Sequence, residues 1–421
     1  MTSEIKQRIE MIKNGEVPHG YKKTIIGIVP ENWDYTRLDN HLVQHYETSE
    51  FSSQYPVLTS SRKGIFLQSD YYNKEVASED NTGYNVVPRG YFTYRHMSDD
   101  EIFKFNINTI VDKGIVSTLY PVFTTKNIND YFLQALLNEG HEFRRYAILQ
   151  KQGGSRTYMY FDKLKKLKVC LPSLPEQDKI AEILSTQDKV IELKEKRIAE
   201  KQRQKKYLMQ QLLTGKQRLP GFSEEWRKCT IHSVSQPITQ KAGSDHYEIL
   251  SISAGIGFVS QSEKFGKEIA GEQYKNYTVI MVEDFSYNKG NSKRYPQGCI
   301  YPLEDRKCAA VPNVFISFRL DKKICSYKYY KFLFENGQLN KQLYRLINSG
   351  VRNDGLLNLY DGDFYNCSIP LPPINEQKVI SDILWSIDHE LTLLQKGLEA
   401  EKQKKKALMQ LLLTGIVRVN T

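Results

Sequence analysis

The sequence contains little that would suit an oxidising compartment, a metal site or a membrane. Its six cysteines are scattered, with no CxxC pair and no histidine at zinc spacing from such a pair, as is typical of a reduced, intracellular protein. The first residues, MTSEIKQRIEMIKNGEV, are charged and lack the apolar core of a secretory leader. No apolar run reaches transmembrane length. These absences argue against a membrane partner and predict a cytoplasmic protein.

The common catalytic motifs are also missing. There is no GxxxxGK[ST] phosphate-binding loop, no GxSxG, no HExxH and no [ND]PP[YF] tetrapeptide. The stretch LPPIN at Leu371 has the prolines without the polar lead or the aromatic, and AGIGF at Ala254 falls short of GxGxxG. We therefore expect a binding protein with no catalytic residue, no metal and no cofactor of its own.

What the chain does have is length, positive charge and tyrosine. Its 421 residues are too many for one ordinary core and predict two or three domains. The formal net charge is +10, which favours a polyanionic partner, although it could also serve solubility alone. The 27 tyrosines favour the polyanion, because their hydroxyls bond phosphate and their rings stack on bases. With a membrane disfavoured, nucleic acid is the predicted partner.

One long segment occurs twice in the sequence, at an offset of two hundred residues. LPSLPEQDKIAEIL, from Leu171, aligns without a gap over LPPINEQKVISDIL, from Leu371, and both copies continue to LLTG; 19 of the 45 aligned pairs are identical. The regions before each copy match more faintly at an offset near 193, where PENWDYTRL lies over SEEWRKCTI. The chain is thus a tandem duplication of a globular segment followed by a long helix. The predicted boundaries are 1–170, 171–215, 216–370 and 371–421.

Both repeated segments have the 4-3 spacing of apolar residues found in coiled coils. Gly215 and Gly415 suit the position just after a helix, and a continuous helix would be roughly 57 Å long. We predict that the two helices pack on each other antiparallel, which creates a pseudo-twofold axis; the alternative is two core helices of a larger domain. The middle of the first seam is polar, at Gln187, Lys194 and Lys201. Apolar residues left over after pairing could dock partner proteins: Ile183, Met209, Ile383 and Met409.

The globular segments mix short β-rich runs with turn residues and one helical stretch each, NDYFLQALLNEG from Asn129 and YKYYKFLFENGQL from Tyr327. This predicts an α+β fold. Polar loops that recur at matched positions with different residues are the candidate DNA contacts. Arg typically hydrogen-bonds guanine, Asn hydrogen-bonds adenine, and Ser, Lys and Tyr bind phosphate. In the first segment these are Ser60, Ser61, Arg62, Lys63, Tyr94, Arg95, His96, Arg156, Thr157 and Tyr158. In the second they are Ser251, Ser253, Tyr287, Asn288, Lys289, Asn291, Lys293, Arg294, Arg352 and Asn353.

The order of these features resembles the specificity subunit of type I restriction-modification systems. The resemblance rests on LPxxxEQ, a long helix ending in LLTG, and the repetition of both after a diverged globular segment, and it covers essentially the whole chain. It implies two target recognition domains joined by two long antiparallel coiled-coil helices. Each domain would recognise one half of a bipartite, asymmetric site in double-stranded DNA, and the helices would set the spacer between the halves.

The resemblance also implies partners that supply the chemistry. Two modification subunits, which bind S-adenosylmethionine and methylate adenine, would be held by the helices from Glu176 to Gly215 and from Glu376 to Gly415. Restriction subunits that use ATP and Mg to translocate and cut DNA would join them. The specificity subunit itself would be non-catalytic. The alternative is a coiled-coil scaffold that binds proteins and whose basic charge is incidental.

Overall fold

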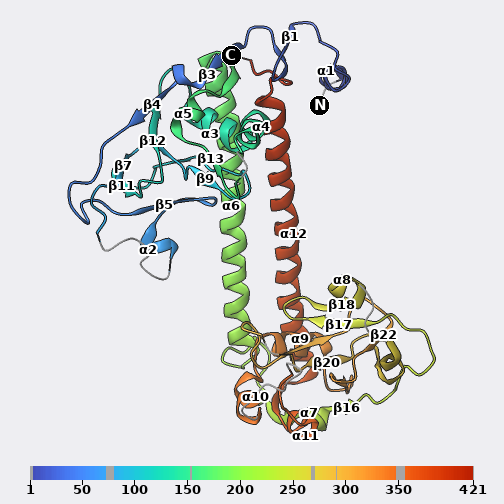
Figure 1. Cartoon of the computed structure of the whole chain (residues 1–421). Coiled ribbons are helices and arrows are strands. Elements are labelled where there is room, and N and C mark those ends of the chain that lie inside the picture. Colours follow the sequence, from blue (N-terminus) through green and yellow to red (C-terminus); the bar gives the residue numbers. More distant parts are fainter. Residues whose placement is uncertain are drawn as a thin grey trace. The chain divides into compact units, whose positions relative to one another are not determined.

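The chain folds into two compact units, each of which contains one globular segment and part of both long helices. The structure is a computed structural model that describes residues 3–72, 80–151, 154–266, 271–290, 292–347 and 356–420. Unit 1 comprises Met1–Lys194 and Gly397–Thr421, and unit 2 comprises Glu195–Lys396. The long helices are α6 (Leu174–Leu212) and α12 (Ile374–Leu412), green and red in Figure 1. The units therefore divide each helix near its middle rather than at its ends.

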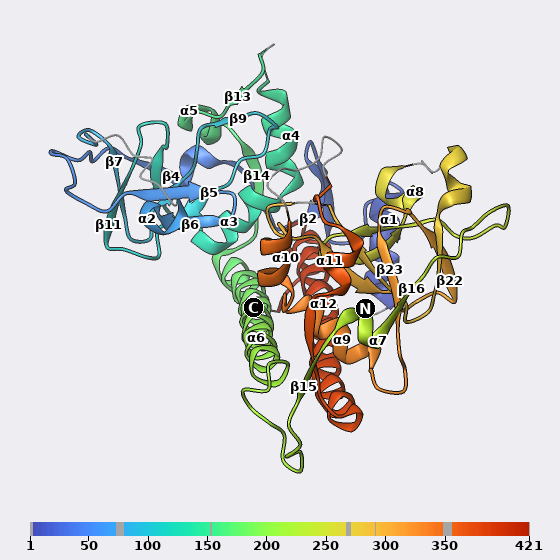
Figure 2. The same cartoon turned by 90° about the horizontal axis from the view of Figure 1, so that it is seen from below.

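In unit 1, short strands are followed by two helices, α3 (Asp130–Glu139) and α4 (His141–Leu149), which are visible in Figure 2. The other helices are α1 (Ser3–Lys13), the 3-10 helix η1 (Leu38–Asn40), α2 (Gln68–Tyr71) and α5 (Phe161–Lys165). The strands are β1 (Tyr21–Thr24), β2 (Gly27–Pro30), β3 (Asp34–Arg37), β4 (Leu42–His45), β5 (Leu58–Ser61), β6 (Gly64–Leu67), β7 (Asn85–Pro88), β8 (Phe92–Thr93), β9 (Met97–Ser98), β10 (Asn106–Ile107), β11 (Lys113–Val116), β12 (Val122–Thr125), β13 (Thr157–Tyr158) and β14 (Lys168–Leu171).

Unit 2 follows the same plan. Its helices are α7 (Ile231–Val234), α8 (Gln261–Phe265), the 3-10 helix η2 (Gly271–Asn276), α9 (Tyr327–Glu335), α10 (Asn340–Leu346) and α11 (Asp361–Tyr365). Its strands are β15 (Arg227–Thr230), β16 (Ser235–Pro237), β17 (Leu250–Ser253), β18 (Gly257–Ser260), β19 (Thr278–Met281), β20 (Phe285–Asn288), β21 (Cys299–Pro302), β22 (Cys308–Val311), β23 (Ile316–Leu320) and β24 (Ser368–Leu371). The α+β fold and the helical stretches predicted from the sequence are confirmed.

The strand order of the largest sheet is the same in both units. In unit 1 it is β10-β8-β12-β4, and in unit 2 it is β21-β20-β23-β16, with antiparallel neighbours in each. Each globular segment is also closed by an antiparallel pair that joins its beginning to its end, β3 with β14 and β15 with β24. The duplication seen in the sequence is therefore a duplication of topology.

Each core is built from aromatic side chains of the central sheet and the helix that follows it. In unit 1, Phe92 and Phe123 stack at 4.8 Å, and in unit 2, Phe285 and Phe318 stack at 5.5 Å. Leucines and isoleucines of the long helices complete both cores. Because burial of such side chains is the main favourable term in folding, one end of each long helix is anchored in each core.

Both long helices end as predicted. Gly215 and Gly415 have φ values of 69° and 68°, a left-handed conformation that glycine adopts without the cost of a Cβ. A Cβ at Gly215 would approach Trp226, and one at Gly415 would meet Pro30 and Trp33. The two glycines thus allow the chain to turn closely against a tryptophan in each unit. Among the described helices, none is both long and apolar enough to cross a membrane.

Candidate functional site

In unit 1, polar side chains join the first half of α6 to the last part of α12. Gln187 donates from Nε2 to the Glu401 carboxylate over 2.8 Å, and the Lys194 ammonium lies 3.6 Å from the same carboxylate. Lys405 forms an ion pair with Asp188. The polar residues that interrupt the apolar seam of α6 are thus partnered by a carboxylate of α12, and the predicted antiparallel pairing is confirmed.

Equivalent contacts join the helices within unit 2. Lys201 lies 2.8 Å from Glu390, and Lys205 lies 2.8 Å from Asp388 and 3.2 Å from Glu335. Burial disfavours the charge on Lys205, but these two carboxylates outweigh that effect and raise its pKa. The Lys205–Asp388 pair of unit 2 corresponds to Lys405–Asp188 of unit 1, which explains why both residues are identical in the two copies.

A buried carboxylate near the start of each long helix is held by an arginine that follows the other helix. Glu176 accepts two hydrogen bonds from Arg418, at 2.6 and 2.8 Å. Glu376 accepts two from Arg218, both at 2.8 Å, and a third from the Trp226 indole. Such bidentate pairs are both strong and specific in direction.

Sequence analysis missed these two arginines, although they also lie two hundred residues apart. The alignment of the two copies stops at Gly215 and Gly415, and Arg218 and Arg418 lie three residues further along. Continuing the alignment past the glycines would have identified the matched pair. The residues that follow each long helix therefore have the same role in both units.

In unit 1, five candidate DNA contacts are exposed: Arg62, Lys63, Arg95, Arg156 and Tyr158. Arg62 and Arg156 each form a surface ion pair, with Asp100 at 2.6 Å and Asp99 at 2.8 Å. The Arg62 guanidinium, together with the Ser98 hydroxyl, lowers the pKa of Asp100 to about 2. These exposed residues remain candidates for DNA contact.

Most of the remaining candidates of unit 1 are buried, so their side chains are not accessible to DNA. Tyr94 is fully buried and donates from its hydroxyl to the Met159 carbonyl oxygen over 2.9 Å. Ser60 and Ser61 belong to strand β5 rather than to a loop, and Ser60 is also buried, as is Thr157 on β13. The structure therefore corrects the prediction that these residues lie in loops. Short strands with several polar residues are similar in composition to loops, so the sequence alone does not separate the two.

His96 is largely buried beneath a stack of aromatic rings. Its Nδ1 lies 2.5 Å from the Leu119 carbonyl oxygen. Its ring stacks on Tyr160 at 4.9 Å, and Tyr160 in turn stacks on Tyr158 at 5.8 Å. Both tyrosines are exposed. The candidate histidine therefore supports an aromatic surface, and Tyr160, which sequence analysis did not select, is part of it.

In unit 2, Lys293 and Arg294 are exposed, and the Arg294 guanidinium lies over the Tyr295 ring. Asn288 and Lys289 are half-buried, and Lys289 lies 3.6 Å from Asp361. Tyr287 is fully buried on β20 and donates to the Gln297 carbonyl oxygen. Its place in the core, like that of Tyr94, corrects the prediction of a surface loop.

The other candidates of unit 2 divide between a strand and undescribed residues. Ser251 and Ser253 lie on β17, where Ser251 is buried and Ser253 is half-buried. Asn291, Arg352 and Asn353 lie outside the described residues.

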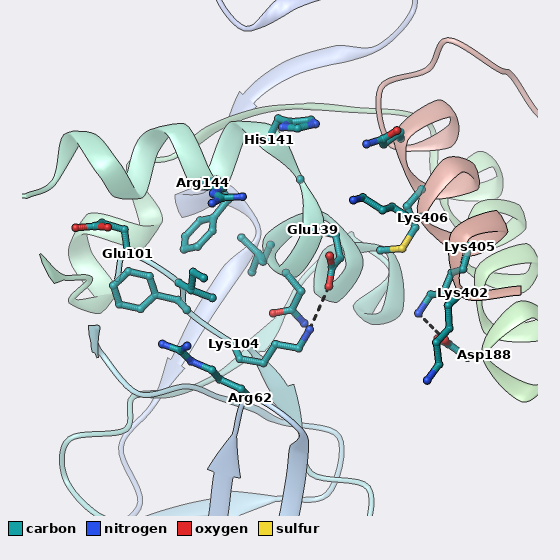
Figure 3. A pocket seen from close by; sticks show the side chains of 18 of the residues that line it. Arg62, Glu101, Lys104, Glu139, His141, Arg144, Asp188, Lys402, Lys405 and Lys406 are labelled. Atoms are coloured by element: carbon teal, nitrogen blue, oxygen red, sulfur yellow. Dashed lines mark hydrogen bonds and ion pairs between the residues drawn. The ribbon is translucent and has the colours of Figure 1, made fainter. Parts of the chain in front are cut away.

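A groove in unit 1 is walled by basic side chains from α12 and from the globular segment (Figure 3). Its volume is about 760 Å³. Lys402, Lys405 and Lys406 line it from α12, and Arg62, Lys104 and Arg144 line it from the globular segment. Its acidic residues are Glu101, Glu139 and Asp188, and its apolar lining includes Phe103 and Phe143. Arg62, one of the predicted DNA contacts, thus lines a basic groove whose other residues were not predicted from the sequence.

The partner-docking residues predicted on the helices are mostly packed inside the units. Met409 is buried in the core of unit 1 and Met209 in that of unit 2, so neither methionine is available at the surface. Ile183 and Ile383 are partly buried against the same cores. The globular segments therefore cover this side of the helices.

Other apolar residues of the long helices are exposed instead. Leu193 and Leu393, identical residues two hundred apart, are 65% and 55% exposed. Tyr207 and Trp385 are also exposed, and Lys328 and Lys331 lie over the Trp385 ring at 4.9 and 4.8 Å. The sequence repeat could have identified these two leucines. An apolar residue that lies outside the helix seam in both copies has no role in pairing, which indicates another role.

A family model matches residues 54–202 and 261–402, more than half of the chain; its description is the type I restriction modification DNA specificity domain. The type I restriction enzyme MjaVIII specificity subunit of Methanocaldococcus jannaschii is 24% identical over 434 residues, covering 93% of this chain and 94% of its own. A provisionally assigned type I specificity subunit of the same organism, MjaX, is 25% identical over 428 residues, covering 95% and 97%.

The fold is similar to a solved structure as well. The crystal structure of the type I restriction-modification S subunit from M. genitalium superimposes with a TM-score of 0.51 at 12% identity, covering 93% of this chain and 97% of that one. The tandem match of the family model agrees with the two units of equal strand order. The chain belongs to the type I restriction-modification DNA specificity family and is a specificity subunit.

Proposed function

We propose that this specificity subunit recognises a bipartite, asymmetric site in double-stranded DNA, with one half-site for each unit. The observation that carries the proposal is a shared fold with different surface residues. The central sheets have the same strand order, and the matched core tyrosines Tyr94 and Tyr287 are followed by Arg95 in unit 1 and Asn288 in unit 2. Arginine suits guanine and asparagine suits adenine, so two such domains suit an asymmetric target.

The residues proposed to contact DNA are the exposed and half-buried members of the candidate sets. In unit 1 they are Arg62, Lys63, Arg95, Arg156 and Tyr158, and in unit 2 they are Ser253, Asn288, Lys289, Lys293 and Arg294. Lysine and arginine side chains at such surfaces neutralise phosphates and hold the protein in register. The net charge of +10 would favour association with any duplex, and the different side chains of the two units would select the sequence.

We further propose that the long helices hold two modification subunits, and through them restriction subunits. The exposed leucines Leu193 and Leu393 support this proposal, because they recur at the same position of both helices. Methylation by S-adenosylmethionine and DNA translocation by ATP and Mg would then take place in the partner subunits. This chain would contribute recognition and positioning, with no catalysis and no cofactor of its own.

The test is a genome-wide map of adenine methylation in the host with and without this gene, with the partner genes kept. Loss of one split, asymmetric motif on deletion is the expected result, and the motif would give both half-sites at once. An unchanged map, with the partner subunits shown to be expressed, would contradict the proposal. It would favour instead a coiled-coil scaffold whose targets are proteins.

A further inference from the structure

The basic groove of unit 1 has more positive than negative side chains. Six lysine and arginine residues and three acidic ones line it, an excess of three positive charges among these nine side chains. Each acidic residue already has a cationic partner: Glu101 pairs with Lys151, Glu139 with Lys104, and Asp188 with Lys405. The acidic side chains therefore do not neutralise the groove as a whole.

Two of its cations are free to bind a ligand. Arg144 and Lys406 form no ion pair with any described residue of the chain, and both line the groove. Lys402 and Lys406 are one helical turn apart on α12, so both lie on the same side of that helix. Arg62 and Arg144 line the opposite side of the groove (Figure 3). Like charges held on two facing walls repel one another unless an anion lies between them.

The walls come from different parts of the chain, which indicates the kind of anion. One wall is the long helix, and the other belongs to the globular segment that carries the proposed contacts to a half-site, including Arg62 itself. A ligand that reaches from the half-site to the helix must be long and must present repeated negative charges. The backbone of DNA does both, with one phosphate every 3.4 Å along each strand.

We propose that this groove holds the DNA backbone beside the first half-site, with Lys402, Lys406 and Arg144 contacting phosphates. This inference rests on the proposed function, and it gives the long helix a role in binding DNA as well as in spacing. It also distinguishes the two units, because Gln202 of α6 stands at the position that matches Lys402. Lys405 is not part of the phosphate set, since its charge is used in the pair with Asp188.

The experiment measures how the affinity for a random-sequence duplex of about 40 base pairs depends on salt concentration. The protein is the full chain, purified with the subunits that accompany it. The groove variant combines Lys402→Ala, Lys406→Ala and Arg144→Ala. The control variant combines Lys166→Ala, Lys189→Ala and Lys404→Ala, which removes the same charge from exposed residues of unit 1 that do not line the groove.

Because each phosphate contact contributes about 0.9 to the slope of log affinity against log salt, the groove variant should flatten this slope by about 2 to 3. Its affinity at about 50 mM salt should fall at least about tenfold. The methylated motif should keep its sequence, since phosphate contacts do not distinguish bases. The control variant should behave like the wild type.

A groove variant with the slope of the control would overturn the proposal. So would a groove variant that binds DNA normally but no longer purifies with its modification subunits, because the groove would then face a protein. A wild-type protein without salt-dependent affinity for DNA would instead contradict the proposed function itself. The two failures are therefore distinguishable in the same titration.

Discussion

In unit 1, His96 supports a surface of stacked tyrosines, whereas at the matched position of unit 2 Lys289 lies 3.6 Å from Asp361. Tyr94 directly follows β8 and Tyr287 lies on β20, which are the matched strands of the two central sheets, and both tyrosines are buried. One fold thus presents an aromatic surface in one unit and a charged pair in the other. The contrast shows that residues beside the central sheet can differ between the units while the core and the strand order stay the same.

The contacts between the long helices show the opposite behaviour. Glu176 and Glu376 are each held by an arginine at the same distance along the repeat, and Asp188 and Asp388 are each held by a lysine. A change in one member would leave a charge with poor solvation, which costs more than an altered surface loop. The framework of the two units is therefore the part that has stayed alike.

The largest expected effect of a substitution is at these buried carboxylates. Arg418→Ala leaves Glu176 without its two donors, and Arg218→Ala leaves Glu376 with the Trp226 indole alone. Breaking a fully buried pair costs about 3–5 kcal/mol. Because both arginines are partly exposed, we expect a cost of about 2–3 kcal/mol, with the larger loss for Arg418→Ala.

Urea unfolding followed by hydrogen exchange measures this effect, because exchange separates the amides of unit 1 from those of unit 2. Each substitution should destabilise its own unit first. The control is Arg89→Ala, which removes an exposed pair with Asp112 and should cost less than about 1 kcal/mol. Equal effects of the control and of Arg418→Ala would show that the buried carboxylate does not stabilise unit 1.

A smaller, selective effect is expected at the DNA surfaces. Arg62→Ala with Arg95→Ala should weaken recognition of one half-site, and Asn288→Ala with Lys289→Ala should weaken recognition of the other. A good base contact is worth about 1–3 kcal/mol of discrimination, so each double variant should lose about tenfold or more in affinity. The measurement is binding to duplexes altered in one half-site at a time. If either variant changed both halves equally, one unit for each half-site would be wrong.

Assembly provides a third way to compare the units. Leu193→Lys and Leu393→Lys replace the matched exposed leucines, and each should weaken the binding of one modification subunit. Because burying a leucine contributes about 1.5–3 kcal/mol, we expect about a tenfold loss or more at each site, measured by sedimentation of the reconstituted complex. Thr186→Lys, another exposed position of α6, is the control. Assembly as strong in the leucine variants as in this control would place the docking surface elsewhere.

The smallest effect is expected from pH. A hydrogen bond from Gln187 lowers the pKa of Glu401, and one from Lys201 lowers that of Glu390. A carboxyl group with a lowered folded pKa stabilises the fold above its unfolded pKa, near 4.5, and this contribution is lost as pH falls through the folded value. The free energy of unfolding should therefore decrease below that pH.

Glu401→Gln and Glu390→Gln should each make this decrease shallower, as followed by urea midpoints at a series of pH values. Glu401→Gln should act on unit 1 and Glu390→Gln on unit 2. Unchanged slopes in both variants would mean that these carboxyl groups do not link pH to helix pairing.

The candidate site could be predicted only in part. A motif such as TYRHMSD contains polar and aromatic residues, but it does not show that Tyr94 points into the core while Arg95 points outward. Successive side chains of a strand point to opposite faces, and strand partners far away in the sequence decide which face is buried. Met209 and Met409 were misplaced for a related reason. They lie outside the seam between the helices, and only the folded globular segments reveal that this side is covered.

The sequence by itself determined the duplication, the ends of the long helices shortly before Gly215 and Gly415, and the antiparallel pairing of these helices. The helix ends follow from local conformational preferences, and the pairing follows from the apolar seam that both copies of the repeat contain. The tertiary structure decided which side chains face outward, which arginine holds Glu176 and Glu376, and that Lys402 and Lys406 face Arg144 across a groove. Those arrangements depend on segments far apart in the chain, because burial and charge pairing are set by whichever elements pack together in the folded unit.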